Sequence, residues 1–121
     1  MLKKQITFID VTGTKQTEEY YFHMNSAEVT LLTAQLGGDI TTAIEQLVQT
    51  RNLGAMIEFI QKLILDSVGI RTQDGGFQKG PDIRNRFEWS EAYAALFEEL
   101  VTEKDAAAQF GEGVVAKGNI K

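Results

Sequence analysis

Few residues in this 121-residue sequence are suited to catalysis or metal binding. His23 is the only histidine and cysteine is absent, so a zinc site would lack its usual set of partners. His23 could act as a general base or a ligand, but the run Tyr20-Tyr21-Phe22-His23 favours a strand-end histidine beside aromatic neighbours. Glu98 and Glu99 diverge by about 100° on a helix, so they cannot share a site within it.

The glycine-rich stretch 69–80 contains two weak ligand-binding patterns. Gly75-Gly76 followed by Lys79-Gly80 suggests a phosphate loop, but the strand–GxxxxGK(S/T)–helix order of such loops is missing. Asp74 is not followed by the alternating oxygen ligands of a calcium loop. The sequence therefore predicts no catalytic residue, no cofactor and no metal ligand, and a protein that is not an enzyme.

Charge is distributed unevenly along the chain. The sequence has 12 basic and 17 acidic residues, a net charge of −5, which argues against a nucleic-acid binder or a membrane-surface protein. Residues 88–112 contain seven acids and one base. Ahead of them, Lys79, Arg84 and Arg86 form a small basic cluster, which either pairs within the chain, for example Arg84 with Glu88, or docks a partner.

Aromatic residues are concentrated in two regions, and consecutive aromatic side chains in the first region cannot all face one core. Two interpretations remain open: ordinary core residues with some exposure, or a surface that binds another protein, where tyrosine and tryptophan are enriched. Under the second interpretation the candidate contact residues are Tyr21, Trp89, Tyr93 and Phe97.

Localisation signals are absent from the sequence as given. No apolar run approaches the ~18 residues of a membrane span. The opening Met1-Leu2-Lys3-Lys4 leads into an alternating segment without the apolar core of a signal peptide. We therefore expect a cytoplasmic protein.

Local signals define the N-terminal elements. Residues 5–24 alternate polar and apolar side chains around a turn at 12–15, which predicts a β-hairpin. Asn25 and Glu28 form a capping-box pattern that begins a helix, and Gly37-Gly38 ends it.

Later helices follow from similar signals. Four more helix starts are marked by a capping residue or a first-turn proline: Asp39, Pro81, Ser90 and Thr102. The helix over 53–68 is apolar around most of its circumference, typical of a central core helix or an oligomer interface. The glycine-rich stretch that follows is expected to be a loop or a small hairpin, and the last helix should run from Glu103 to about Phe110.

These elements predict an α+β fold that is mainly α, with an N-terminal β-hairpin packed on a bundle of about five helices. We expect a single domain over 1–112 and a flexible C-terminal tail over 113–121. The two-faced hairpin and the helix over 53–68 together offer more apolar surface than these helices can cover, so we also expect a homo-oligomer.

The order of several sequence runs is informative beyond their local structure. These runs are Ile6-Thr7-Phe8-Ile9-Asp10, the segment from Thr17 to Val29, Ile57 to Leu65, the Asp74-Gly75 loop, Phe87 to Leu100, and Asp105 to Phe110. Taken together, over roughly 5–112, the chain resembles the tail assembly chaperones of long-tailed bacteriophages that infect Gram-positive hosts. Gly80-Pro81 and the bulky Trp89 depart from the family pattern.

This resemblance implies a non-enzymatic factor of the host cytoplasm that is absent from the mature virion. Such a factor binds the tape measure protein, keeps it soluble and helps recruit tail tube subunits. In line with the acidic composition, we expect no nucleic-acid, membrane or small-molecule partner. The alternative is a small structural virion protein, such as a head–tail connector or a tail component.

Overall fold

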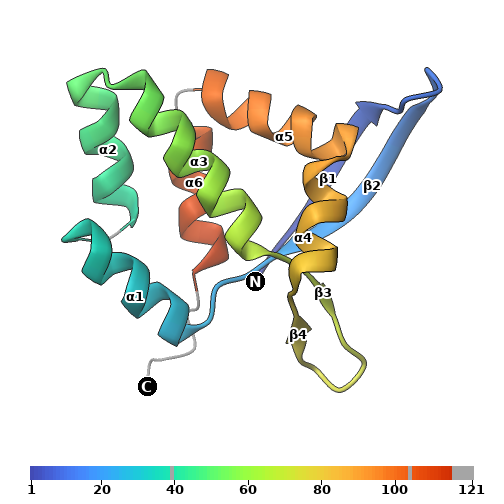
Figure 1. The fold of residues 1–121 in the computed structure, drawn as a ribbon, viewed down its shortest axis with the longest axis horizontal. Coiled ribbons are helices and arrows are strands. Elements are labelled where there is room, and N and C mark those ends of the chain that lie inside the picture. The colour runs from blue at the N-terminus through green and yellow to red at the C-terminus, as the bar shows by residue number, and fades with distance from the viewer. Residues whose placement is uncertain (39, 104, 116–121) are drawn as a thin grey trace.

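The computed structural model describes residues 1–38, 40–103 and 105–115 (Figure 1). In chain order its elements are β1 (Leu2–Ile9), β2 (Lys15–Phe22), α1 (Ser26–Leu36), α2 (Ile40–Thr50), α3 (Leu53–Ser67), β3 (Val68–Arg71), β4 (Phe77–Gln78), α4 (Pro81–Glu88), α5 (Glu91–Thr102) and α6 (Ala106–Val114). The strands form one antiparallel sheet in the order β1-β2-β3-β4. The predicted α+β, mainly helical fold is confirmed, with six helices in the described part of the chain rather than about five.

The β1–β2 turn is organised by the carboxylate of Asp10. It accepts hydrogen bonds from the Thr12 hydroxyl, the Thr12 and Thr14 backbone amides, and the Gln16 amide. These bonds, the Thr12 hydroxyl foremost, hold the pKa of Asp10 far below its usual range. Gly13 supplies the positive φ of 88° that the turn requires. The predicted hairpin is therefore confirmed.

The start of α1 also follows the sequence prediction. Asn25 Oδ1 accepts from the Glu28 amide and Glu28 Oε1 accepts from the Asn25 amide, each at 2.9 Å. Gly37 adopts the left-handed conformation and its amide donates to Thr33 O, which ends the helix. The expected cap of α2, Asp39, lies outside the described residues.

The glycine-rich stretch after α3 is a hairpin that extends the sheet. β3 pairs with β2 through Tyr21↔Gly69 and Phe22↔Val68, and then with β4. A side chain at Gly69 would collide with the Phe77 ring and lie 2.6 Å from the Gln78 carbonyl oxygen. Only glycine allows this close approach of the two strands.

One face of the sheet packs against the helices, and α3 forms the centre of the core. Phe22 contacts Phe87 of α4 and Phe110 of α6 in edge-on geometry, with ring centroids 5.7 and 5.1 Å apart. Most of α3 is buried, including Ile60, Leu63 and Ile64. Of the two roles considered for this helix, the core role is the one observed.

The last helix differs from the prediction at both ends. Thr102 does not cap it, because Thr102 is the final residue of α5 and its hydroxyl donates to Glu98 O. α6 begins at Ala106 and continues past Phe110 to Val114, which is fully buried. The glycines that suggested a tail instead permit close packing, since a Cβ at Gly113 would meet the Leu2 side chain at 3.1 Å. Residues 116–121 of the expected tail lie outside the described residues.

Truncating α3 at its buried face tests its central role. Leu63→Ala should lower the free energy of unfolding by about 2–5 kcal/mol, through lost burial and the cavity that remains. Leu53→Ala on the same helix is the control, because Leu53 is 64% exposed whereas Leu63 is 2% exposed. Urea denaturation of both variants measures the difference, and equal losses would contradict a core centred on α3.

Candidate functional site

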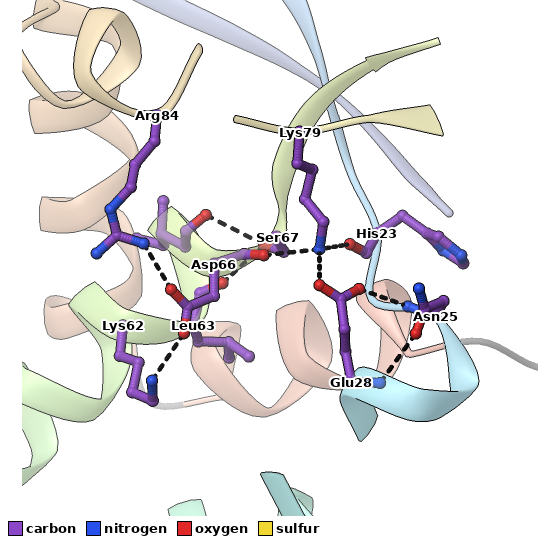
Figure 2. A network of polar contacts seen from close by, with 10 residues as sticks. His23, Asn25, Glu28, Lys62, Leu63, Asp66, Ser67, Lys79 and Arg84 are labelled. Carbon is purple, nitrogen blue, oxygen red and sulfur yellow. Dashed lines mark hydrogen bonds and ion pairs between the residues drawn. The ribbon is translucent and has the colours of Figure 1, made fainter. Parts of the chain in front are cut away.

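A network of charged side chains joins the sheet to α1, α3 and α4 (Figure 2). The ammonium of Lys79 donates to His23 O at 3.1 Å, Asp66 O at 2.8 Å and Glu28 Oε2 at 2.6 Å. Glu28 is the same residue that completes the capping box with Asn25. Lys79 therefore connects the end of β2, the C-terminal turn of α3 and the first turn of α1.

Asp66 forms the second half of this network. Its carboxylate accepts from Lys62 at 2.9 Å and from Arg84 at 2.5 Å. Burial alone would raise the pKa of Asp66, but these two cations outweigh burial and lower the pKa. The basic cluster thus pairs within the chain at two of its members, although Arg84 pairs with Asp66 across two helices rather than with Glu88 on its own helix.

The chemistry available in this network is structural. Each carboxylate faces a cation, so neither is an unpaired base, and the Ser67 hydroxyl donates to the carbonyls of Leu63 and Ile64 (Figure 2). His23 contributes its backbone carbonyl, while its ring packs on Phe77 with centroids 5.6 Å apart. Burial first, and then nearby positive charge, lowers the pKa of His23 and favours the neutral imidazole. This arrangement fits the strand-end interpretation of His23.

The described residues contain no group of three or more histidine, aspartate or glutamate side chains that could hold a metal ion. Within the same residues, no helix combines the length and apolar character needed to cross a bilayer. The features that remain on the surface are apolar side chains and grooves.

Large apolar side chains are exposed at several separate places. The most exposed are Val11 at the hairpin tip, 88%, and Trp89 at the end of α4, 79%. The others are Met1, Ile9, Leu31, Leu53, Ile57 and Ile70. A groove of about 310 Å³ between α2–α3 and α5–α6 has Leu53 at its edge, and one of about 450 Å³ lies between α4 and the sheet. These are surfaces suited to binding another protein.

The four aromatic residues selected from the sequence do not form one cluster. Tyr93 and Phe97 lie together, with ring centroids 5.8 Å apart, and both are half-buried at the margin of the core. Tyr21 is on the sheet face opposite the helices, since its neighbour Tyr20 contacts Phe87 on the helical side. Tyr21 is thereby separated from the other three, and Trp89 is the most exposed of the four.

Sequence reasoning did not find the network or the exposed residues of the helices. Lys79 and Glu28 are 51 positions apart, and no periodicity connects them. Ile57 belongs to the apolar circumference of α3, the central core helix, yet it is exposed at 37%. Such placements depend on how the helices pack, which a single sequence does not report.

Fold and surface together define a small, mainly helical α+β protein with a cation-bridged scaffold and exposed apolar side chains. The sequence model of the phage tail assembly chaperone family matches residues 1–118, and the chain belongs to this family. This match confirms the family indicated by the sequence runs. No curated protein and no solved structure gives a significant match.

Removing the ammonium of Lys79 tests the structural role of the network. Lys79→Met should lower the free energy of unfolding by about 1–3 kcal/mol, because two carbonyls lose a donor and Glu28 loses its cation. The control is Lys62→Met, whose side chain is 53% exposed and whose pair with Asp66 lies on one helix. That variant should change stability by less than about 0.5 kcal/mol. Similar losses in chemical denaturation would contradict a special role for Lys79.

Proposed function

We propose that this tail assembly chaperone binds the tape measure protein, keeps it soluble and helps recruit tail tube subunits. It acts in the host cytoplasm, is absent from the mature virion, and serves a long-tailed phage of a Gram-positive host. The observation that carries the proposal is a well-packed core combined with large apolar side chains left on the surface, above all Trp89. Family membership supports the assembly role.

Apolar contacts suit a chaperone because they are non-directional. They cover exposed stripes on a long helical client without requiring one sequence. Residues 88–112, with seven acids and one base, give the chaperone–client complex a strong negative charge. That charge keeps such complexes soluble and apart from one another.

Among the four candidate contact residues, we assign the main role to Trp89. Its side chain is 79% exposed and adds little to the core. Tyr93 and Phe97 pack against each other at the margin of the core. Their exposed ring edges remain available to a client. Tyr21, on the open sheet face, contributes a separate contact.

Client solubilisation tests this assignment. Trp89→Ser should reduce the soluble fraction of a co-expressed tape measure protein several-fold, with thermal unfolding of the chaperone nearly unchanged. Val11→Ser is the matched control, an apolar side chain of similar exposure at the hairpin tip. Soluble client is quantified after centrifugation. Full solubilisation by the Trp89 variant would contradict the assignment, and an insoluble client with the wild-type chaperone would contradict the proposed function.

We also propose that the chaperone self-associates through its exposed apolar residues. Most of α3 is buried, so only its first turns can contribute to an interface between two copies. Leu53 and Ile57 are exposed there. Light scattering at micromolar concentration should report a mass above that of the 13.5 kDa monomer. A monomeric mass over a wide concentration range would contradict self-association and leave these side chains for the client.

The competing function is that of a structural virion protein, a head–tail connector or a tail component. Both roles use exposed apolar surface, but they differ in the finished particle. Immunoblotting of purified virions separates them, because an assembly chaperone is missing from the particle whereas a structural protein is present in stoichiometric amounts.

A further inference from the structure

The strand β2 has an unpaired stretch of backbone next to a groove. Along its whole length β2 pairs with β1, but it pairs with β3 only at Tyr21 and Phe22. Beyond these two residues β3 diverges and pairs with β4 instead. In Figure 1 the hairpin projects past the helices, with β2 on the side away from α5. The second edge of β2, from Lys15 to Tyr20, is left without a neighbouring strand among the described residues.

The hydrogen bonds around the hairpin show which backbone groups point to this edge. Asp10 N donates to Thr14 O at 2.9 Å, so this pair is hydrogen-bonded, and every second pair along the ladder is too. Thr17 and Glu19 belong to the alternate pairs, whose amides and carbonyls point away from β1. His23 N, in the same alternation, donates to Ser67 O on the β3 side at 2.8 Å. Thr17 and Glu19 therefore present free donors and acceptors.

The groove of about 450 Å³ lies beside this edge, where α4, β2 and β3 separate. Its apolar wall includes Tyr20, Ile83 and Phe87. Glu18 and Asp82 are exposed carboxylates of the lining, and neither forms an ion pair with another described residue. The groove thus combines an apolar wall with two carboxylates and one cation, Arg86, which leaves its lining net negative. Glu18 also accepts a hydrogen bond from the Tyr20 hydroxyl at 2.6 Å.

We propose that an extended segment of a partner protein adds as a strand to the edge of β2. Only extended backbone satisfies the free groups of Thr17 and Glu19 in register. Side chains opposite one another across a strand pair share a face, so the side chain opposite Tyr20 enters the groove. The side chain two residues along meets Glu18. The fitting segment carries an apolar residue and, two positions away, a lysine or arginine.

The other long edge of the sheet, on β1, is less suited to a partner. It carries two lysines, Lys3 and Lys4, which disfavour pairing with another strand, whereas the free stretch of β2 carries only Lys15 at its end. Lys4 is also held by Glu99 of α5 at 3.1 Å. The adjacent hollow, about 200 Å³, is less than half the size of the groove beside β2.

This inference rests on the proposed function in one respect: the partner is taken to be a tail protein handled by the chaperone. The edge itself is tested without any client. The probe is a fluorescein-labelled peptide of about ten residues, a strand-length segment, alternating threonine and valine with one lysine two positions after the central valine. Fluorescence anisotropy measures its binding at low salt.

The decisive variant is Thr17→Pro, which removes one edge-facing amide and no β1–β2 hydrogen bond. Thr7→Pro is the matched control, because Thr7 pairs with Thr17 and its amide points to the opposite edge. Both variants also lose the Thr7–Thr17 hydroxyl contact of 2.9 Å, so that loss cancels in the comparison. Thr17→Pro should weaken peptide binding about tenfold or more, and Thr7→Pro by less than about twofold.

A second arm does not depend on the folding of a variant. The same peptide methylated at alternate backbone nitrogens should lose binding to the wild-type protein, and a peptide with glutamate in place of lysine should bind about tenfold more weakly. Equal binding of the methylated peptide, or equal losses in the two proline variants, would overturn strand addition. A wild-type dimer dissociated by Thr17→Pro but not by Thr7→Pro would assign the edge to a second copy and overturn the partner segment.

The client assay separates this inference from the function. If Thr17→Pro abolishes peptide binding yet solubilises the tape measure protein as well as wild type, the edge is not used for that client and the inference fails, while the function stands. If the peptide binds as expected but wild type does not solubilise the client, the function fails and the edge remains a strand-binding site.

Discussion

The hydrogen bonds from the Lys79 ammonium to three separate acceptors hold the sheet against α1 and α3. Two of these acceptors are backbone carbonyls, at the end of β2 and in the last turn of α3, and the third is the carboxylate of Glu28. A cation is favoured at a helix C-terminus, where the carbonyls have no partner within the helix. Because Lys79 follows β4 directly, the β3–β4 hairpin must return to α1, and this places β3 against β2.

The same constraint shapes the surface. With the sheet held against α4 and α6 on one face, Phe22 and Ile6 are buried, whereas the hairpin tip projects with Ile9 and Val11 uncovered. The core side chains and the polar groups of the network therefore find their contacts within the chain. The exposed apolar side chains and the free backbone groups of β2 lie at the periphery. This division suits the proposed binding of a client by the folded chaperone.

Sequence reasoning succeeded where the determining residues are close together. The Asn25–Glu28 box, the β1–β2 turn at Gly13 and Pro81 in the first turn of α4 each depend on contacts within a few residues. It failed where tertiary contacts decide. The glycines of 111–121 suggested a tail, but Gly113 allows close packing of α6 against Leu2. Strand alternation predicted that Tyr20 and Tyr21 lie on different faces of the sheet. The separation of Tyr21 from Trp89 depends on how the helices pack on the sheet, which local patterns do not specify.

The packing of α6 against the β1–β2 hairpin and the residues that follow it also governs the order of events during synthesis. The ring of Phe110 covers Phe22, and Met24 N donates to Val114 O at 2.8 Å. The β1–β2 hairpin therefore leaves the ribosome with its inner face uncovered and stays so until nearly all the described chain has followed. Contacts of such long sequence separation slow folding and extend the time during which apolar strands are exposed. The core of each molecule is therefore complete only once α6 has left the ribosome, so the last helix of the described chain finishes the folding of its first hairpin.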